Sequence, residues 1–268
     1  MNRLDGDNAD TGQAMRRAWY LRCGPDDVGT HAILVGDRGR VWLGAELLTG
    51  ARFLNEDRGL TTVTGEYAGR RVTISAFGMG APIAAVVLHE LAGLGVGTFI
   101  RLGTVLGLPP VRLGDLVLAH GAVRGESTSH TYLPVEFPAV PDPDLYHAAR
   151  DTLSGLARTV RTGVYASYDG FYTQMFPPGP DDEHRISERI VELRRAGVAA
   201  IDMETSALLI AGRKLGVRTA SLCLASVDGL SHARLDDAER EDAERDLMKA
   251  GLAVLAAAPG TTTEGDHR

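Results

Sequence analysis

The chain is poor in cysteine, and its two cysteines lie far apart. Cys23 and Cys223 are the only ones among 268 residues, and neither belongs to a spacing typical of metal ligands. Such a sequence offers neither a disulfide framework nor a cysteine-based metal site. We therefore expect two ordinary thiols, no metal ion and a cytoplasmic protein.

Long apolar runs and an excess of positive charge are also missing. No apolar stretch is long enough to span a bilayer, and residues 1–15 are polar and acidic, without the apolar segment of a signal peptide. The 28 lysines and arginines are outnumbered by 35 aspartates and glutamates, giving a net charge of −7. This balance argues against partnership with nucleic acid or a membrane surface.

The chain does have enough apolar sequence, 44% of its residues, for one large core. Strand patterns such as residues 31–35, 98–104 and 219–226 alternate with helical patterns such as 142–156 and 238–258. The alternation predicts a layered α/β domain with a mainly parallel sheet. Because no linker or repeat interrupts it, we expect one domain over residues 17–258, a disordered lead over 1–16 and a disordered tail over 259–268.

The most informative stretch is residues 199–209, where two carboxylates flank a methionine. Asp202 and Glu204 follow a strand pattern and precede apolar residues at helical spacing up to Leu215, with Gly216 as a natural helix end. Acidic side chains in a first helical turn favour the positive end of the helix dipole. Helix capping therefore explains both residues as well as a binding role does, and the stretch alone leaves both interpretations open.

A glycine turn and one arginine indicate an anion site. Residues 36–40, Gly-Asp-Arg-Gly-Arg, join a strand pattern to a helical one, where backbone N–H groups favour an anion, although a tight turn is the simpler explanation. Arg101 stands in an otherwise apolar strand pattern, and a buried guanidinium needs an anionic partner. Ligands of open α/β sheets bind beyond the carboxyl ends of strands, and Arg101 is expected near the C-terminal end of its strand, which makes it a functional candidate.

Five segments, in order along the chain, resemble the successive motifs of nucleoside phosphorylase family I, and most closely its uridine phosphorylase branch. Each motif is modest alone, but the five together cover roughly residues 19–252. The resemblance implies a single-domain, three-layer αβα fold with a central mixed, mainly parallel sheet. The segments are Gly36-Asp37-x-x-Arg40, Gly78-Met79-Gly80-Ala81-Pro82, Phe99-Ile100-Arg101-Leu102-Gly103-Thr104, Pro134-Val135-Glu136-Phe137-Pro138 and Asp202-Met203-Glu204-Thr205-Ser206-Ala207.

The resemblance implies that phosphate attacks the anomeric carbon of a nucleoside and that the base leaves. The transition state has oxocarbenium character, so catalysis depends on electrostatics and positioning, with inorganic phosphate as co-substrate and no cofactor. Guanidinium groups suit phosphate oxygens. The phosphate-binding residues implied are Gly36, Arg40, Arg58, Arg101 and Thr104.

The resemblance also implies that the site is shared between subunits. Arg58 corresponds to an arginine that the family donates from a neighbouring subunit, although a solvated loop charge would also explain it. We therefore expect a homo-oligomer, with a dimer as the smallest active unit and a hexamer as the full assembly.

Sugar and base contacts follow from the same resemblance. A carboxylate can accept hydrogen bonds from both ribose hydroxyls, which gives Glu204 that role and makes Arg101 and Glu204 the catalytic residues. Met203 would pack on the sugar, and Tyr20 would stand near its 5′ position in place of a histidine. Phe171, Gln174 and Val227 are the implied base contacts. Core packing alone would also explain Met203 and Phe171.

The chain departs from the family where the base is recognised. The glutamine and arginine that read uracil correspond to Met175 and Pro177, with Gln174 adjacent, and a further arginine corresponds to Gly229. A purine-type enzyme would need an aspartate directly after Ser226, where this chain has Val227. Recognition of the base and of the 5′ position is therefore altered, and a 5′-modified substrate is one consequence we consider.

We predict phosphorolysis of a pyrimidine, uridine-like nucleoside, with a 5′-modified nucleoside as an alternative substrate, to free base and (deoxy)ribose 1-phosphate. A nucleosidase is an alternative, although a hydrolase needs a carboxylate base for water and has no use for three converging arginines. A non-catalytic member that binds a nucleoside or phosphosugar would fit the lost base contacts. A dinucleotide-binding protein is disfavoured because Gly-x-Gly-x-x-Gly does not follow the first strand.

Overall fold

The computed structural model describes residues 17–259, apart from the side chains of residues 180 and 181. The lead expected over residues 1–16 and all but the first residue of the expected tail lie outside this range. The helices are α1 (Arg38–Ala45), α2 (Ala81–Gly93), α3 (Pro143–Leu153), α4 (Pro180–Arg195), α5 (Thr205–Leu215) and α6 (Asp237–Ala257). The strands are β1 (His31–Val35), β2 (Thr49–Asn55), β3 (Thr62–Tyr67), β4 (Arg70–Ala76), β5 (Thr98–Gly107), β6 (Leu116–Gly125), β7 (Val160–Tyr168), β8 (Val198–Asp202) and β9 (Arg218–Asp228).

All the strands belong to one mixed sheet in the order β2-β3-β4-β1-β5-β8-β7-β6-β9. Parallel pairings join β1 to β4 and β5, β5 to β9, β6 to β7 and β7 to β8, and the others are antiparallel. The predicted mixed α/β sheet is therefore confirmed. Because β9 also pairs with β5, the strands β5-β8-β7-β6-β9 close into a ring, which the alternation of patterns could not show.

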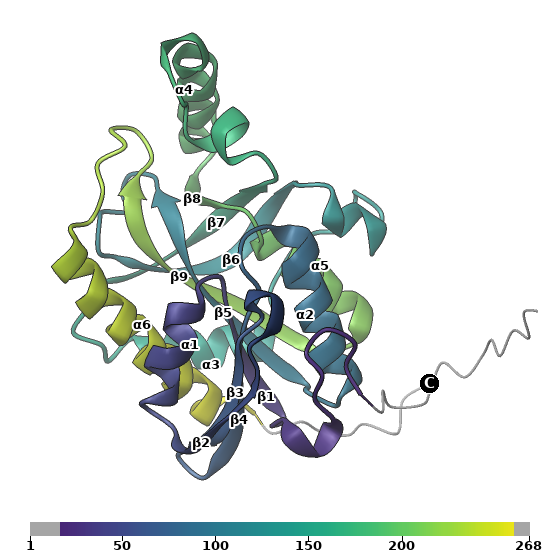
Figure 1. The fold of residues 1–268 in the computed structure, drawn as a ribbon. Helices are drawn as coiled ribbons and strands as arrows, with labels where there is room; N and C mark the ends of the chain where they lie inside the picture. The colour runs from purple at the N-terminus through teal and green to yellow at the C-terminus, as the bar shows by residue number, and fades with distance from the viewer. Residues whose placement is uncertain (1–16, 260–268) are drawn as a thin grey trace, which may run out of the picture.

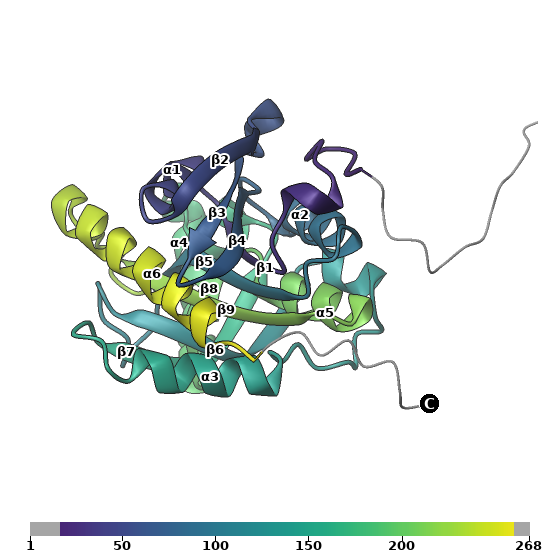
Figure 2. The ribbon, with the colours of Figure 1, turned by 90° about the horizontal axis from the view of Figure 1, so that it is seen from below.

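Helices cover both faces of the sheet, as Figures 1 and 2 show. The side chains of β1 alternate between two cores, with Ile33 and Val35 in one and Ala32 and Leu34 in the other. The first core is completed by α1, α3 and α6, and the second by α2 and α5. A strand buried on both faces has a continuous apolar sequence, which is why residues 31–35 were recognisable as a strand. The predicted αβα layering is confirmed.

Two elements differ from the prediction. The proline- and charge-rich composition of residues 176–185 predicts a loop, but α4 begins within this segment at Pro180, a residue that suits the first helical turn. Its buried side chains Ile186, Ile190 and Leu193 pack on the end of the ring, while the rest of α4 projects from the body (Figure 1). Strand β2 was not predicted, because it is an exposed edge strand without alternating apolar residues.

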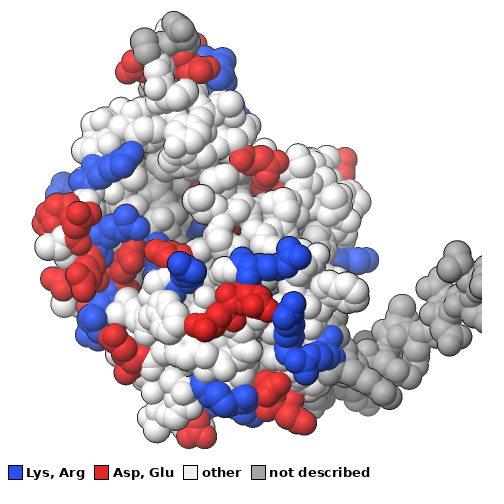
Figure 3. All heavy atoms as spheres, in the orientation of Figure 1, with Lys and Arg blue, Asp and Glu red and all other residues white. Residues whose placement is uncertain are grey.

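Surface features agree with the composition. On the face drawn in Figure 3, basic and acidic side chains are interleaved, so neither sign of charge dominates that face. Within residues 17–259, no helix combines the length and apolar character needed to cross a membrane.

We expect Gly216→Ala to lower the free energy of unfolding by about 1–2 kcal/mol. Gly216 ends α5 with φ of 70°, and an added Cβ would meet no atom within 4 Å, so the cost is that of the left-handed backbone alone. Urea unfolding measures it. Gly155→Ala is the control, because Gly155 has equal space without a positive φ. Equal effects of the two substitutions would contradict this explanation.

Candidate active site

A cavity of about 590 Å3 lies where several strands end. Residues that follow β1 and β4 line it, as do the C-terminal residues of β8, residues of β9 near its C-terminal end, and the second half of β5. The lining residues are Gly36, Asp37, Arg38, Arg40, Gly59, Gly78, Met79, Arg101, Gly103, Thr104, Val105, Leu106, Phe171, Met175, Ile201, Asp202, Met203, Glu204, Ser226, Val227 and Arg240. This is the position at which α/β sheets bind ligands.

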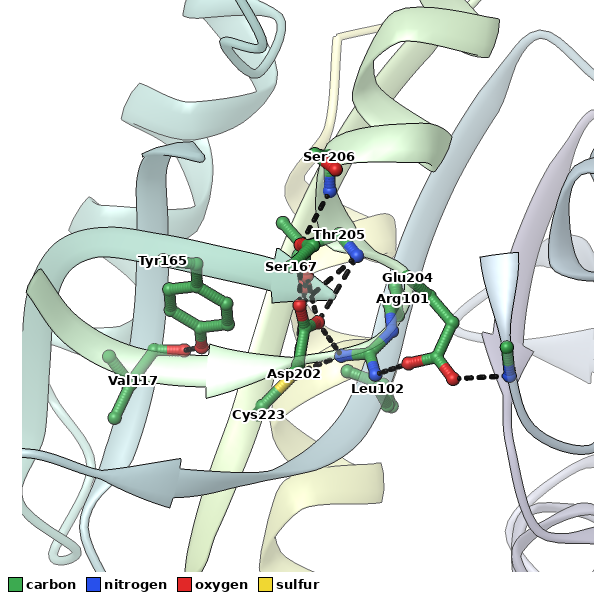
Figure 4. Close-up of polar contacts among 12 residues, drawn as sticks. Arg101, Leu102, Val117, Tyr165, Ser167, Asp202, Glu204, Thr205, Ser206 and Cys223 are labelled. Carbon is green, nitrogen blue, oxygen red and sulfur yellow. Dashed lines mark hydrogen bonds and ion pairs between the residues drawn. The ribbon is translucent and has the colours of Figure 1, made fainter. Parts of the chain in front are cut away.

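Arg101 is the buried centre of the site (Figure 4). One terminal nitrogen, Nη2, pairs with Glu204. The other, Nη1, lies 3.2 Å from Oδ2 of Asp202 and 2.6 Å from Sγ of Cys223. A Cβ at Gly103 would stand only 2.5 Å from Nη1, so the space for the guanidinium depends on glycine at that position. Strand β5 extends to Gly107, so Arg101 lies in mid-strand and not near its end as predicted.

The charge of Arg101 is permanent in this setting. Burial opposes the charged form, but the negative charges of Asp202 and Glu204 outweigh it, so the pKa of Arg101 lies above its ordinary value. Burial raises the pKa of the Cys223 thiol, more than the neighbouring Arg101 lowers it. The site therefore holds a fixed cation beside a neutral thiol.

Asp202 has its carboxylate oxygens engaged by donors. Oδ1 accepts from the Ser167 hydroxyl at 2.6 Å, and Oδ2 accepts from the backbone N–H and the hydroxyl of Thr205, at 3.1 and 2.5 Å. The contact with Arg101 is added to these bonds. Asp202 thus caps the start of α5 and also holds Arg101, so capping explains only part of its role.

Glu204 is held differently from Asp202. It stands at the N-terminus of α5 but makes no capping bond there. Its Oε1 accepts from the backbone N–H of Gly80 at 2.7 Å, and Oε2 accepts from Arg101. Glu204 therefore joins the turn before α2 to β5 at the cavity, and helix capping, which remained possible from the sequence, does not explain it.

Arg40 brings a second buried guanidinium to the cavity. The turn of residues 36–40 positions it, because Asp37 caps α1 by accepting from the N–H of Gly39 at 2.8 Å. Arg40 lies 3.3 Å from Glu244 and 3.4 Å from the carbonyl oxygen of Leu102. The Nε atoms of Arg40 and Arg101 have no acceptor among the described residues. Protein groups thus leave both guanidinium groups incompletely satisfied.

The opposite part of the cavity is apolar. Leu106, Met175 and Ile201 belong to one buried cluster, against which Phe171, Met203 and Val227 pack. The ring of Phe171 stacks on Phe176, with centroids 5.6 Å apart. The cavity therefore joins a charged end to an apolar end.

The structure brings together eight of the predicted site residues. Gly36, Arg40, Arg101, Thr104, Phe171, Met203, Glu204 and Val227 all line the cavity. Gln174 does not line it: its side-chain oxygen accepts from the N–H of Gly170 at 2.8 Å, and it borders a separate hollow beside Arg185 and Arg189. A short helical turn over Phe171–Met175 directs Met175 to the cavity in its place.

Tyr20 and Arg58 also lie outside the lining of this cavity, but they contact each other. The guanidinium carbon of Arg58 stands 5.5 Å from the centroid of the Tyr20 ring. Because the next residue, Gly59, does line the cavity, this pair lies close to its rim.

Some lining residues were missed by sequence reasoning. Arg240 comes from α6, far along the chain, and no local signal marked it. Ser226 directly precedes Val227 at the end of β9, so it could have been inferred from the strand pattern. No group of three or more histidine, cysteine, aspartate or glutamate side chains within residues 17–259 is placed to bind a metal ion.

Comparisons with known proteins all identify phosphorylases. The family model described as "Phosphorylase superfamily" matches residues 30–258. A uridine phosphorylase of Thermococcus kodakarensis is 34% identical over 208 residues, 76% of this chain and 75% of its own. A guanosine phosphorylase of Halorubrum lacusprofundi is 35% identical over 80% of this chain and 84% of its own. The crystal structure of a Vibrio fischeri uridine phosphorylase superposes with a TM-score of 0.81 at 28% identity, covering 91% of this chain and 98% of that one.

We expect Asp202→Asn to lower the free energy of unfolding by about 3–5 kcal/mol, because Arg101 loses a buried partner charge. Urea unfolding is the measurement. Glu126→Gln is a matched control: Glu126 is equally buried but accepts only from neutral donors, Ser129 and Ser206. It should cost no more than about 1–3 kcal/mol. If both variants lose the same stability, Asp202 is not distinguished by its contact with Arg101.

Proposed function

The chain belongs to the phosphorylase superfamily and is a nucleoside phosphorylase, and we propose that its cavity catalyses attack of inorganic phosphate on C1′ of a nucleoside. The products are free base and ribose or deoxyribose 1-phosphate. The observation that carries the proposal is the contact of Arg101 with Glu204 beside Arg40 and Thr104, in one cavity at the strand ends.

Phosphate would bind at the charged end. Arg40 and Arg101 supply fixed positive charge, the turn at Gly36 supplies the N-terminus of α1, and Thr104 supplies a hydroxyl group. These groups suit the oxygens of a phosphate dianion. No cofactor enters the proposed reaction, since the entering nucleophile is phosphate itself.

The sugar would bind between phosphate and the apolar end. Glu204 is placed to accept from ribose hydroxyls, and Met203 offers an apolar contact for the ring. Positive charge that develops on the sugar as the base departs would lie between phosphate and the Glu204 carboxylate. Such fixed opposite charge is the usual means of stabilising an oxocarbenium-like transition state.

The base would occupy the apolar end, against Phe171 and Val227. The named relatives include uridine and guanosine phosphorylases. We propose that uridine-like pyrimidine nucleosides are among the substrates. Because Gln174 faces its own turn, contact and shape would contribute more to base binding than side-chain hydrogen bonds.

Tyr20 and Arg58 support a shared site. Both are outside the cavity lining of their own chain. Two exposed apolar side chains lie close by: Trp19, 82% exposed, precedes Tyr20 in the sequence, and Met79, 85% exposed, lines the cavity. We propose that a second copy covers this region and that each chain lends Arg58 to phosphate and Tyr20 to the 5′ position in its neighbour. A dimer would then be the smallest active unit and a hexamer the full assembly, within the cytoplasm. A phenol in place of an imidazole at the 5′ position would tolerate a 5′-modified sugar.

Hydrolysis by the same scaffold has less support. A nucleosidase needs a carboxylate that can accept a proton from water. Asp202 is engaged by Ser167 and Thr205, and Glu204, which contacts Gly80 and Arg101, is assigned to the ribose hydroxyls, so neither carboxylate is left for water. A non-catalytic binding protein would keep affinity for the nucleoside without releasing base.

Release of base should depend on phosphate. We expect turnover of uridine to fall by about tenfold or more when phosphate is replaced by a buffer without oxyanions, because the entering nucleophile is lost. Chromatographic detection of free uracil measures it, and arsenate should restore release. Equal release without phosphate would establish a nucleosidase and exclude the phosphorolysis that we propose.

Mixed oligomers test whether Arg58 acts on a neighbouring site. Arg58→Ala and Glu204→Ala should each lower kcat/KM by about tenfold or more, since each loses charge-assisted contacts to substrate. When the two variants are unfolded together and refolded as a mixture, part of the activity should return, because some sites then combine an intact Glu204 with a neighbour's intact Arg58.

The control mixture pairs Glu204→Ala with Arg101→Met. Glu204 and Arg101 contact each other within one chain, so no hybrid site contains both and no activity should return. If the Arg58 mixture behaves like this control although mixed oligomers form, Arg58 does not act between subunits.

A further inference from the structure

Helix α2 carries a buried carboxylate, Glu90, that the proposed reaction does not use. Glu90 is 6% exposed, and the buried residues beside it on the same helix, Val87, Leu88 and Leu91, belong to the apolar core. Burying a carboxylate is costly, and an apolar side chain would fill this core at lower cost. Core packing therefore does not explain a glutamate at this position.

Both carboxylate oxygens of Glu90 bind one turn near the start of the described chain. Oε1 accepts from the backbone N–H of Tyr20 at 2.8 Å, and Oε2 accepts from the backbone N–H of Leu21 at 2.9 Å. We call residues 18–23 the N-terminal turn, because a backbone hydrogen bond of 2.9 Å joins its two ends. Successive N–H groups aimed at one carboxylate form a backbone anion site. Glu90 therefore fixes the N-terminal turn against α2, beside which it lies in Figures 1 and 2.

The N-terminal turn in its turn holds the segment that carries Arg58. The guanidinium carbon of Arg58 lies 5.5 Å from the centroid of the Tyr20 ring, and Nη1 of Arg22 lies 2.6 Å from Oδ2 of Asp57. Two side chains of the turn thus engage two consecutive residues, and the next residue, Gly59, lines the cavity.

The backbone supports this connection. Arg22 and Arg58 both have positive φ, 53° and 56°, in the left-handed region that arginine seldom adopts. Such a conformation persists only where the surrounding contacts determine the backbone, and it is concentrated at functional sites. The N-terminal turn and the Arg58 segment are therefore built to hold one another in place.

We propose, resting on the shared site proposed for this cavity, that Glu90 is a positioning residue for the reaction in the neighbouring subunit. Glu90 itself touches neither phosphate nor nucleoside. By holding the N-terminal turn on α2, it sets where Tyr20 stands and, through Tyr20 and Arg22, where Arg58 points when the pair enters the neighbour's site. Loss of Glu90 then damages what a chain lends to its neighbour and leaves the cavity of the same chain intact.

The alternative is that Glu90 acts on the cavity of its own chain. Helix α2 begins directly after Gly80, whose N–H binds Glu204, so a disturbed α2 would displace Glu204 within the same chain. The two routes make opposite predictions for mixed oligomers, because the first damages what a chain lends and the second damages what it keeps.

Glu90→Gln is the first test. The amide keeps the shape of the side chain but sets an NH2 group against one of the two backbone N–H donors, so the turn loses a fixed position. We expect KM for phosphate to rise by about fivefold or more, because Arg58 is the group that the turn holds for phosphate. Glu126→Gln is the matched control, since Glu126 is also buried and accepts from the N–H of Ser129 and the hydroxyl of Ser206, away from this turn. It should leave KM for phosphate at the parent's value.

Refolded mixtures of variants decide between the two routes. Glu90→Gln mixed with Glu204→Ala should regain activity, because some sites then join the intact cavity of the first variant to the correctly held Arg58 of the second. Glu90→Gln mixed with Arg58→Ala should regain none, because both variants lack the same contribution. The reverse pattern, or recovery in both mixtures or in neither although mixed oligomers form, would overturn the proposal.

A second variant keeps the proposal falsifiable if Glu90→Gln does not assemble. Tyr20→Ala combined with Arg22→Gln changes only exposed side chains and removes both contacts of the turn with residues 57–58. KM for phosphate should rise, and adding Arg58→Ala should raise it no further than Arg58→Ala alone, since the three side chains act as one unit. An unchanged KM for phosphate would show that the N-terminal turn does not hold Arg58, and would overturn the proposal.

Failure of the proposed function gives different results. If the parent releases no base with phosphate, the phosphorolysis is refuted, and if Arg58→Ala mixed with Glu204→Ala regains nothing, the shared site is refuted. Either result also overturns the role of Glu90. If that mixture recovers while the two mixtures with Glu90→Gln show the reverse pattern, the shared site stands and only the role of Glu90 is overturned.

Discussion

A buried guanidinium in the middle of β5 governs the centre of this structure. Because charge without a partner is costly inside a protein, the terminal nitrogens of Arg101 need anionic or polar partners. Asp202 comes from β8, Cys223 from β9 and Glu204 from the start of α5, so three elements converge on one side chain. Gly103 completes the arrangement by leaving the space that the guanidinium fills.

As a result, the cavity has a charged end and an apolar end. Strand β5 carries Arg101 and Thr104 towards the charged end and Leu106 towards the apolar end, within six residues of one strand. The pleat and length of a single strand therefore fix the distance between the two ends. A ligand that fills the cavity has to be anionic on one side and apolar on the other, with a polar middle at Glu204.

Much of this could be predicted, and the failures have physical causes. Arg101 was identified because an arginine in an apolar strand needs a partner, and β1 because burial on both faces gives a continuous apolar run. Closure of the ring through β5 and β9 leaves no mark on either strand's composition. Gln174 was misplaced because a short helical turn over Phe171–Met175 decides which of two adjacent side chains faces the cavity, and no sequence period reports such a turn.

The same contacts show which partner of Arg101 can yield to a ligand. Asp202 also accepts from Ser167 and from the backbone and hydroxyl of Thr205, so moving it would break several buried hydrogen bonds and uncap α5. Glu204 makes one bond to the backbone N–H of Gly80 and one contact with Arg101, and it lines the cavity. Unmade buried hydrogen bonds are costly, so rearrangement on binding follows the partner with fewer of them. Asp202 is thus the fixed anchor of Arg101, and Glu204 is the partner that can turn towards a sugar while phosphate takes its place on the guanidinium.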